Sequence, residues 1–61
     1  MKEYEIIEKV GISNKNYSDA VNNAIKNVQK DKDVFWFEVV EFRGRVNSGD
    51  IEYQAIVKIG V

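Results

Sequence analysis

The sequence contains no cysteine and no histidine in its 61 residues. Without cysteine the chain can form neither a disulfide nor a thiolate metal site, and without histidine it lacks the commonest neutral metal ligand. A domain of this size buries only about 60% of its unfolded surface, so small folds usually depend on disulfides, a metal or oligomerisation. We therefore expect one domain over residues 1–61 that is stabilised by self-association.

A charge excess of either sign is also missing, because 9 Lys and Arg residues stand against 10 Asp and Glu residues and the net charge is −1. This balance gives no electrostatic reason to bind nucleic acid or an anionic membrane. No apolar run approaches the roughly 20 residues of a membrane helix, and the N-terminus has no apolar signal core. We expect a cytoplasmic protein with no nucleic-acid and no membrane partner.

What the chain does have is a clear periodicity of apolar residues. Residues 2–12 alternate, which predicts a half-buried strand, with breaks only at Ile7 and Glu8. The apolar face of this strand carries Tyr4, Ile6, Val10 and Ile12, and the charged face carries Glu3, Glu5 and Lys9. A helix is predicted next, with Asn16 as its N-cap and Asp19 in its first turn. Its apolar face holds Tyr17, Ala20, Val21, Ala24, Ile25 and Val28, at helical spacing without a miss.

Two further strands are predicted after the charged connector at residues 30–33. The first runs from about Val34 to Arg45 and the second from Ile51 to Val61, separated by a turn cluster at residues 47–50. The odd positions of the last strand are apolar and its even positions are mostly polar. The expected fold is α+β, in the order β-α-β-β, with a three-stranded antiparallel sheet packed on one helix.

The only tryptophan, Trp36, lies between Phe35 and Phe37, so aromatic residues occupy both faces of one strand. If odd residues pair with odd residues in the hairpin, Phe35, Phe37 and Val39 join the core under the helix. Trp36, Glu38, Val40 and Phe42 then share the opposite face with Gln54, Ile56 and Lys58. The other register buries Glu38 without a partner, which is costly, and a bulge near Gly44 would alter either register.

In the favoured register Gln54 lies nearly opposite Phe42, six residues along the strand from Trp36. At ~3.3 Å per residue the separation is roughly 20 Å. Trp36 and Gln54 of one chain therefore cannot easily contact the same small ligand. If they share a pocket, they come from different chains. The outer face is also more apolar than a monomer should expose.

The pattern of residues 36–41 (WFEVVE), Arg43-Gly44 and residues 53–60 (YQAIVKIG) resembles the dodecins, a family of small flavin-binding proteins. The turn at residues 10–13 and the helix segment at residues 23–25 fit the same family. The resemblance covers nearly the whole chain in the same order and spacing. It implies a β-α-β-β subunit, assembled as a hollow homododecamer with flavins bound in pairs at subunit interfaces.

The resemblance also implies roles for five residues. Trp36 matches the tryptophan that stacks on the isoalloxazine ring, and Gln54 matches the glutamine that hydrogen-bonds its polar edge. Glu41 falls near the flavin side chain, and Arg43 and Arg45 fall in a segment used near ligand phosphates or at interfaces. The cofactor implied is FMN or riboflavin. Coenzyme A, which some bacterial members bind, is less well supported, because Arg45 stands where those members often have His and the chain stops at Val61.

Each of these residues also has an ordinary structural interpretation. Trp36 could be an interface aromatic, Gln54 a solvated residue of the sheet, and Arg43 and Arg45 solvated arginines at a strand end, or partners of a carboxylate such as Glu41 or Glu38 on another chain. No catalytic constellation is present, since no nucleophile stands beside a base and there is no Gly-rich phosphate loop. We therefore expect a flavin-storing, photoprotective binder and not an enzyme. The alternatives are an oligomerising structural module without flavin and, third, a small flavoenzyme.

Overall fold

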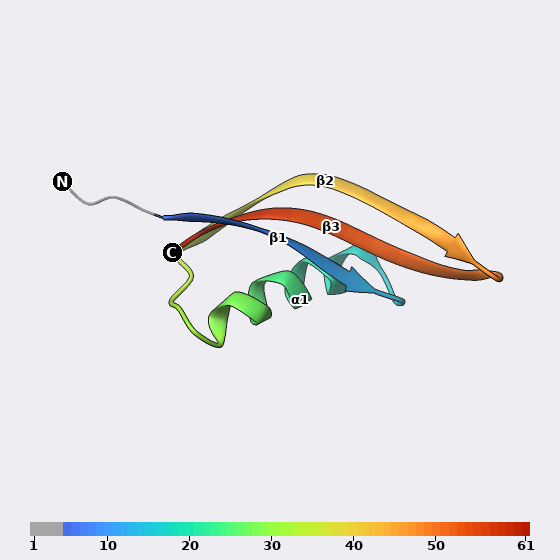
Figure 1. Cartoon of the computed structure of the whole chain (residues 1–61), viewed down its shortest axis with the longest axis horizontal. Helices are drawn as coiled ribbons and strands as arrows, with labels where there is room; N and C mark the ends of the chain where they lie inside the picture. The colour runs from blue at the N-terminus through green and yellow to red at the C-terminus, as the bar shows by residue number, and fades with distance from the viewer. Residues whose placement is uncertain (1–4) are drawn as a thin grey trace.

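The computed structural model describes residues 5–61, which fold as strand, helix, strand and strand (Figure 1). The elements are β1 (Ile6–Ser13), α1 (Tyr17–Gln29), β2 (Trp36–Asn47) and β3 (Asp50–Gly60). The strands form one antiparallel sheet in the order β1-β3-β2, and α1 lies along one face of it. The predicted α+β fold is confirmed. Glu3 and Tyr4, which were expected in the first strand, lie outside the described residues.

The helix begins and packs as its sequence pattern predicts. The Asn16 side chain accepts a hydrogen bond from the backbone N–H of Asp19 at 2.7 Å, which caps the first turn. The small residues of the apolar face allow a close approach to β1: a side chain at Gly11 would overlap the carbonyl group of Ala20. Glycine at this position is therefore a packing requirement.

The core is small, and within residues 5–61 its fully buried apolar side chains come from two elements. Six apolar residues are buried, three from α1 and three from β3: Ala20, Ala24, Val28, Ala55, Val57 and Ile59. The helix packs on β1 and β3 and barely reaches the edge strand β2. Phe37 pairs with Ile59 and so has the predicted parity, but it remains 51% exposed, and Phe35 is 56% exposed. The expectation that both lie under the helix was wrong, because the helix does not cover that edge.

The hairpin between β2 and β3 closes with a two-residue turn, as the turn cluster predicts. Ser48 and Gly49 both have positive φ, at 54° and 86°, as a type I′ turn requires. Asn47 pairs with Asp50 on either side of the turn. Because β1 ends opposite Tyr53, the tip of the hairpin extends beyond the rest of the sheet (Figure 1).

A β-bulge in β2 separates two registers. Val39 lies opposite Val57, and Glu41 lies opposite Ile56, so Val40 is an extra residue between them. Beyond the bulge the alternation of faces is reversed relative to the predicted register. Phe42 therefore lies on the helix side, where its ring centroid is 5.0 Å from that of Tyr17. The prediction that Phe42 lies on the opposite face was wrong, because the bulge occurs before it and not near Gly44.

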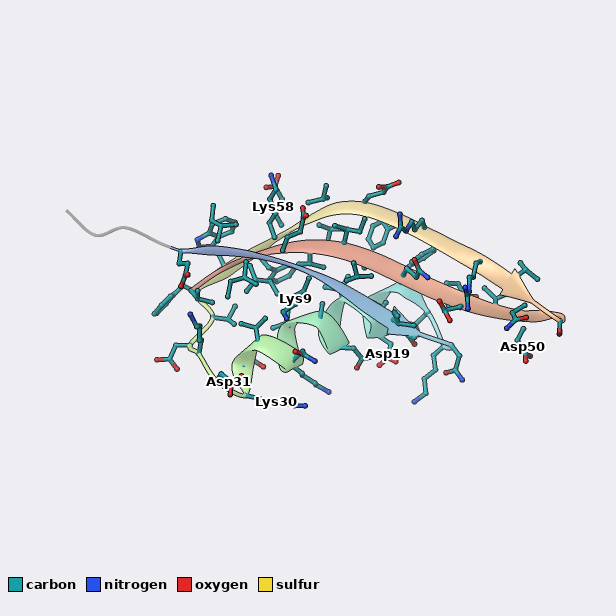
Figure 2. All side chains as sticks on the ribbon, viewed as in Figure 1. Lys9, Asp19, Lys30, Asp31, Asp50 and Lys58 are labelled. Carbon is teal, nitrogen blue, oxygen red and sulfur yellow. The ribbon has the colours of Figure 1, made fainter. Side chains whose placement is uncertain are left out.

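The face of the sheet turned away from α1 is called the outer face below. Strand β1 places its apolar residues Ile6, Val10 and Ile12 there, opposite Gly60, Ile56 and Gln54 of β3. Its odd residues face the helix, and among them Ile7 packs against the core. Figure 2 shows the two directions, with Lys58 projecting away from α1 and Lys9 projecting toward it. The predicted alternation is confirmed, but its apolar side is the uncovered one.

Candidate functional site

All five predicted site residues occupy outer-face positions of the sheet. Their register partners are Gly60 for Trp36, Ile56 for Glu41, Gln54 for Arg43 and Glu52 for Arg45. The bulge is responsible for this arrangement, because regular alternation of faces through Val40 would turn the odd positions 41, 43 and 45 toward the helix. The structure thus brings the candidates onto one surface, although it does not bring all of them together.

Trp36 is the first residue of β2. Its indole can lie against the sheet because its cross-strand partner, Gly60, has no side chain. Its indole occupies the space where a Cβ atom of Gly60 would stand, next to Nε1, Cε2 and Cδ1. Gly60 is buried as a result, whereas Trp36 is only half-buried. An aromatic ring fixed on one side and open on the other can stack on a flat ligand. Gly60 was not among the site residues predicted from the sequence. The signal available was a glycine near the end of the last strand, opposite the tryptophan in the hairpin.

Gln54 is the centre of a polar row made of Arg43, Gln54, Glu52 and Arg45. The Arg43 Nε–H donates to Gln54 Oε1 at 3.0 Å, and Gln54 Nε2 donates to Glu52 Oε2 at 2.6 Å. Arg45 Nε lies 3.6 Å from the same Glu52 oxygen. The cross-strand pairs place the two arginines beside Gln54 and Glu52, and the two-residue repeat of β3 places Glu52 beside Gln54. Sequence reasoning missed Glu52, although that spacing puts it on the face of Gln54.

The tryptophan and the polar row lie at opposite ends of the sheet. Trp36 pairs with Gly60, six residues along β3 from Gln54, which corresponds to roughly 20 Å. The separation expected from the sequence therefore holds, although the bulge moves the partner of Gln54 from Phe42 to Arg43. One chain cannot place both Trp36 and Gln54 against one small ring.

The outer face between these ends is uncovered in the single chain, and its apolar residues lie beside a charged row of Glu8, Lys58 and Glu38. Ile6, Val10 and Ile12 each expose about half of their surface, at 56%, 48% and 51%. Several apolar side chains exposed on one face are typical of a binding or association face. From the sequence, Trp36, Val40, Phe42 and Ile56 were predicted to form the apolar part of this face. Phe42 lies on the helix side instead, and the apolar residues of β1 contribute to the outer face.

A hollow of about 420 Å³ lies between the end of β1, the start of α1 and the hairpin, and Glu52 of the polar row borders it. Its lining is largely polar and includes none of the five predicted site residues: Ile12, Ser13, Asn14, Asp19, Asn23, Asn47, Asp50, Ile51 and Glu52. Within residues 5–61 no group of three or more Asp and Glu side chains is placed to hold a metal ion. No helix in that part of the chain is long and apolar enough to cross a membrane.

Comparison with known proteins gives a consistent result. Residues 4–61 match the family model described as Dodecin. The dodecin of Streptomyces davaonensis is 37% identical, with a TM-score of 0.85 over 95% of this chain and 88% of that one. A variant of the dodecin of Thermus thermophilus is 31% identical, with a TM-score of 0.91 over 98% of this chain and 92% of that one.

A more distant structure, the calcium dodecin of Mycobacterium tuberculosis, is 22% identical, with a TM-score of 0.90 over 98% of this chain and 89% of that one. At that identity the likeness concerns the fold alone. No curated protein sequence matches the chain.

Proposed function

The chain belongs to the dodecin family, and on that premise we propose that it binds flavin for storage and photoprotection. The ligand is riboflavin or FMN, and its isoalloxazine ring stacks on Trp36 at subunit interfaces of a homododecamer. Gln54 of another chain bonds the polar edge of the ring. No catalytic role is assigned to the protein.

The observation that carries this proposal is the position of Trp36. Its indole is half-buried on an uncovered face of the sheet, held against Gly60 and distant from the polar row by roughly 20 Å. An aromatic residue in that place is available to a second chain and to a flat ligand between the two. Association would cover the outer face and complete the site in the same step.

The residues of the chain fit a flavin chemically. A bound flavin supplies a flat, electron-poor ring with an edge of alternating carbonyl and N–H groups. The electron-rich indole of Trp36 gains about 0.5–1.5 kcal/mol from offset stacking, beyond the burial of area. The indole can also donate an electron to the photoexcited ring, which quenches the excited state before it does damage.

The remaining predicted residues contribute charge. Arg43 and Arg45 place two permanent positive charges near Gln54, which suits the phosphate of FMN. Glu41, two residues before Arg43 on the same face, is assigned to the region of the flavin side chain. Coenzyme A also carries phosphates and is a competitor to include in binding experiments.

The test is a fluorescence titration of riboflavin and FMN with purified protein. We expect loss of the green flavin emission on binding, and Trp36→Ala should abolish most of the quenching while the assembly keeps its mass in light scattering. Phe37→Leu is the matched control, because Phe37 is adjacent to Trp36 but has the opposite parity. Unchanged flavin emission with the wild-type protein would refute the proposal.

An oligomerising module without ligand is the second candidate, and the uncovered apolar face favours it. Both candidates predict a large assembly, so its mass does not separate them. The visible absorbance spectrum after addition of riboflavin and removal of excess ligand does. A protein that retains no flavin absorbance would be such a module, with Trp36 acting as an interface aromatic.

A further inference from the structure

The polar row contains more than the glutamine that the flavin site requires. Gln54 is bonded on both sides, by Arg43 at its carbonyl oxygen and by Glu52 at its amide nitrogen, at 3.0 Å and 2.6 Å. Glu52 in turn lies 3.6 Å from Arg45 and keeps only 30% of its side chain exposed. Arg43 is therefore positioned by β2, and Glu52 is positioned by its ion pair with Arg45.

These contacts allow only one orientation of the Gln54 amide. An arginine side chain is a donor with no acceptor, and an ionised glutamate is an acceptor with no donor. If the amide were rotated by half a turn, its NH₂ group would face Arg43 and its oxygen would face Glu52, and both hydrogen bonds would be lost. Hydrogen bonds to charged groups are also stronger than bonds between neutral groups. The orientation is thus fixed by chemistry and not by packing.

Resting on the proposed flavin function, we propose that Glu52 is a positioning residue that sets the hydrogen-bonding order Gln54 presents to the ligand. With one N–H given to Glu52 and one oxygen lone pair taken by Arg43, Gln54 retains one donor and one acceptor in a fixed order. The complementary ligand edge is an N–H beside a carbonyl, the imide edge of the isoalloxazine ring. The site selects flat rings with an intact imide and rejects rings alkylated at that nitrogen.

Glu52→Gln tests this proposal with little change in size. A glutamine at this position can donate as well as accept, so only Arg43 then favours the observed orientation of the Gln54 amide. We expect the Kd of riboflavin to rise about 5- to 10-fold, as for the loss of one hydrogen bond of average strength. The Kd of N3-methylriboflavin should rise less than about twofold, so discrimination between the two ligands falls.

Asp50→Asn is the matched control, because Asp50 precedes Glu52 by two residues on the same strand. It makes the same change from carboxylate to amide without a contact to Gln54, and should leave both dissociation constants unchanged. In a Gln54→Leu background, Glu52→Gln should no longer affect riboflavin binding. An equal effect of Glu52→Gln with and without Gln54, or an unchanged discrimination ratio, would overturn the proposal.

A measurement without ligand separates this inference from the proposed function. The chain contains only two glutamines, Gln29 and Gln54, so labelling with ¹⁵N-glutamine gives two side-chain amide groups in a nuclear magnetic resonance spectrum. We expect the Gln54 amide protons to exchange slowly with water, and Glu52→Gln to accelerate this exchange while Gln29 stays the same. Fast exchange in the wild-type protein would overturn the fixed orientation. Slow exchange in a protein that binds no flavin would support it, and only the flavin function would fail.

Discussion

At the scale of single residues, the position of the indole depends on a residue that has no side chain. Trp36 can lie against the sheet only because Gly60 is opposite to it. At both ends of the candidate site, neighbouring residues determine where the side chain points. Gln54 is oriented by its hydrogen bonds to Arg43 and Glu52. Trp36 and Gln54, which are proposed to contact the ligand, were named from the sequence, whereas Gly60 and Glu52, which hold them in place, were not.

Gly60→Ala should displace the indole without unfolding the chain. The added methyl group would overlap Trp36, whose side chain can rotate away, while the backbone of β3 stays paired. We expect the emission of this sole tryptophan to shift to longer wavelength, and riboflavin to bind about 10-fold more weakly because the stacking geometry is lost. Fluorescence and flavin titration provide the two measurements.

The control for this substitution is Gly49→Asn in the hairpin turn. Gly49 has open space around it and a φ of 86°, which asparagine tolerates better than most residues. The control should leave the emission of Trp36 and the binding of riboflavin as in the wild type. The interpretation of Gly60 would be wrong if Gly60→Ala behaved like the control.

At the scale of elements, the parts determined by local signals were predicted and the parts determined by distant contacts were not. The cap at Asn16, the helical spacing of the alanines and the turn at Ser48 and Gly49 are all encoded within a few residues. The bulge at Val40 and the incomplete cover of β2 depend on how the strand and the helix meet the rest of the sheet. For this reason Phe37 and Phe42 were assigned incorrectly.

Deletions in β2 test the importance of face alternation. Deletion of Val40 removes the bulge but leaves Val39 facing the helix and Glu41 facing outward, so every cross-strand pair remains. Deletion of Phe42 instead forces Arg43 toward Tyr17 or makes the strand slip. We expect the first deletion to change the free energy of unfolding by no more than about 1 kcal/mol and the second to lower it by about 2–4 kcal/mol. Urea unfolding at one protein concentration measures both, and equal losses would contradict this account.

At the scale of the whole molecule, the interior is too small for the surface it leaves uncovered. Within residues 5–61 the buried apolar side chains are six, all of them alanine, valine or isoleucine, whereas several apolar residues of β1 and β2 remain half exposed. The extents of 50 × 20 × 13 Å describe a thin, elongated layer with few residues far from solvent. A chain of this shape gains stability by covering its outer face with other copies.

The thermal midpoint should therefore depend on protein concentration. We expect it to rise by about 4–8 °C for a tenfold increase in concentration, because assembly stabilises only the folded chain. Val10→Lys, at an exposed outer-face position opposite Ile56, should reduce both the mass in light scattering and this dependence. Lys9→Gln, on the helix side of the same strand, is the control. A midpoint that does not change with concentration would mean that the chain is stable alone.

The distance along β3 between Gln54 and Gly60 predicts how two different mutant copies of the gene would behave in one cell. Because roughly 20 Å separates Trp36 from Gln54 in one chain, a shared site takes one residue from each of two copies. A cell that carries two different defective alleles, one lacking the tryptophan and one lacking the glutamine, would build mixed assemblies in which some sites are whole. The two defects would complement each other, although they lie in the same 61-residue chain.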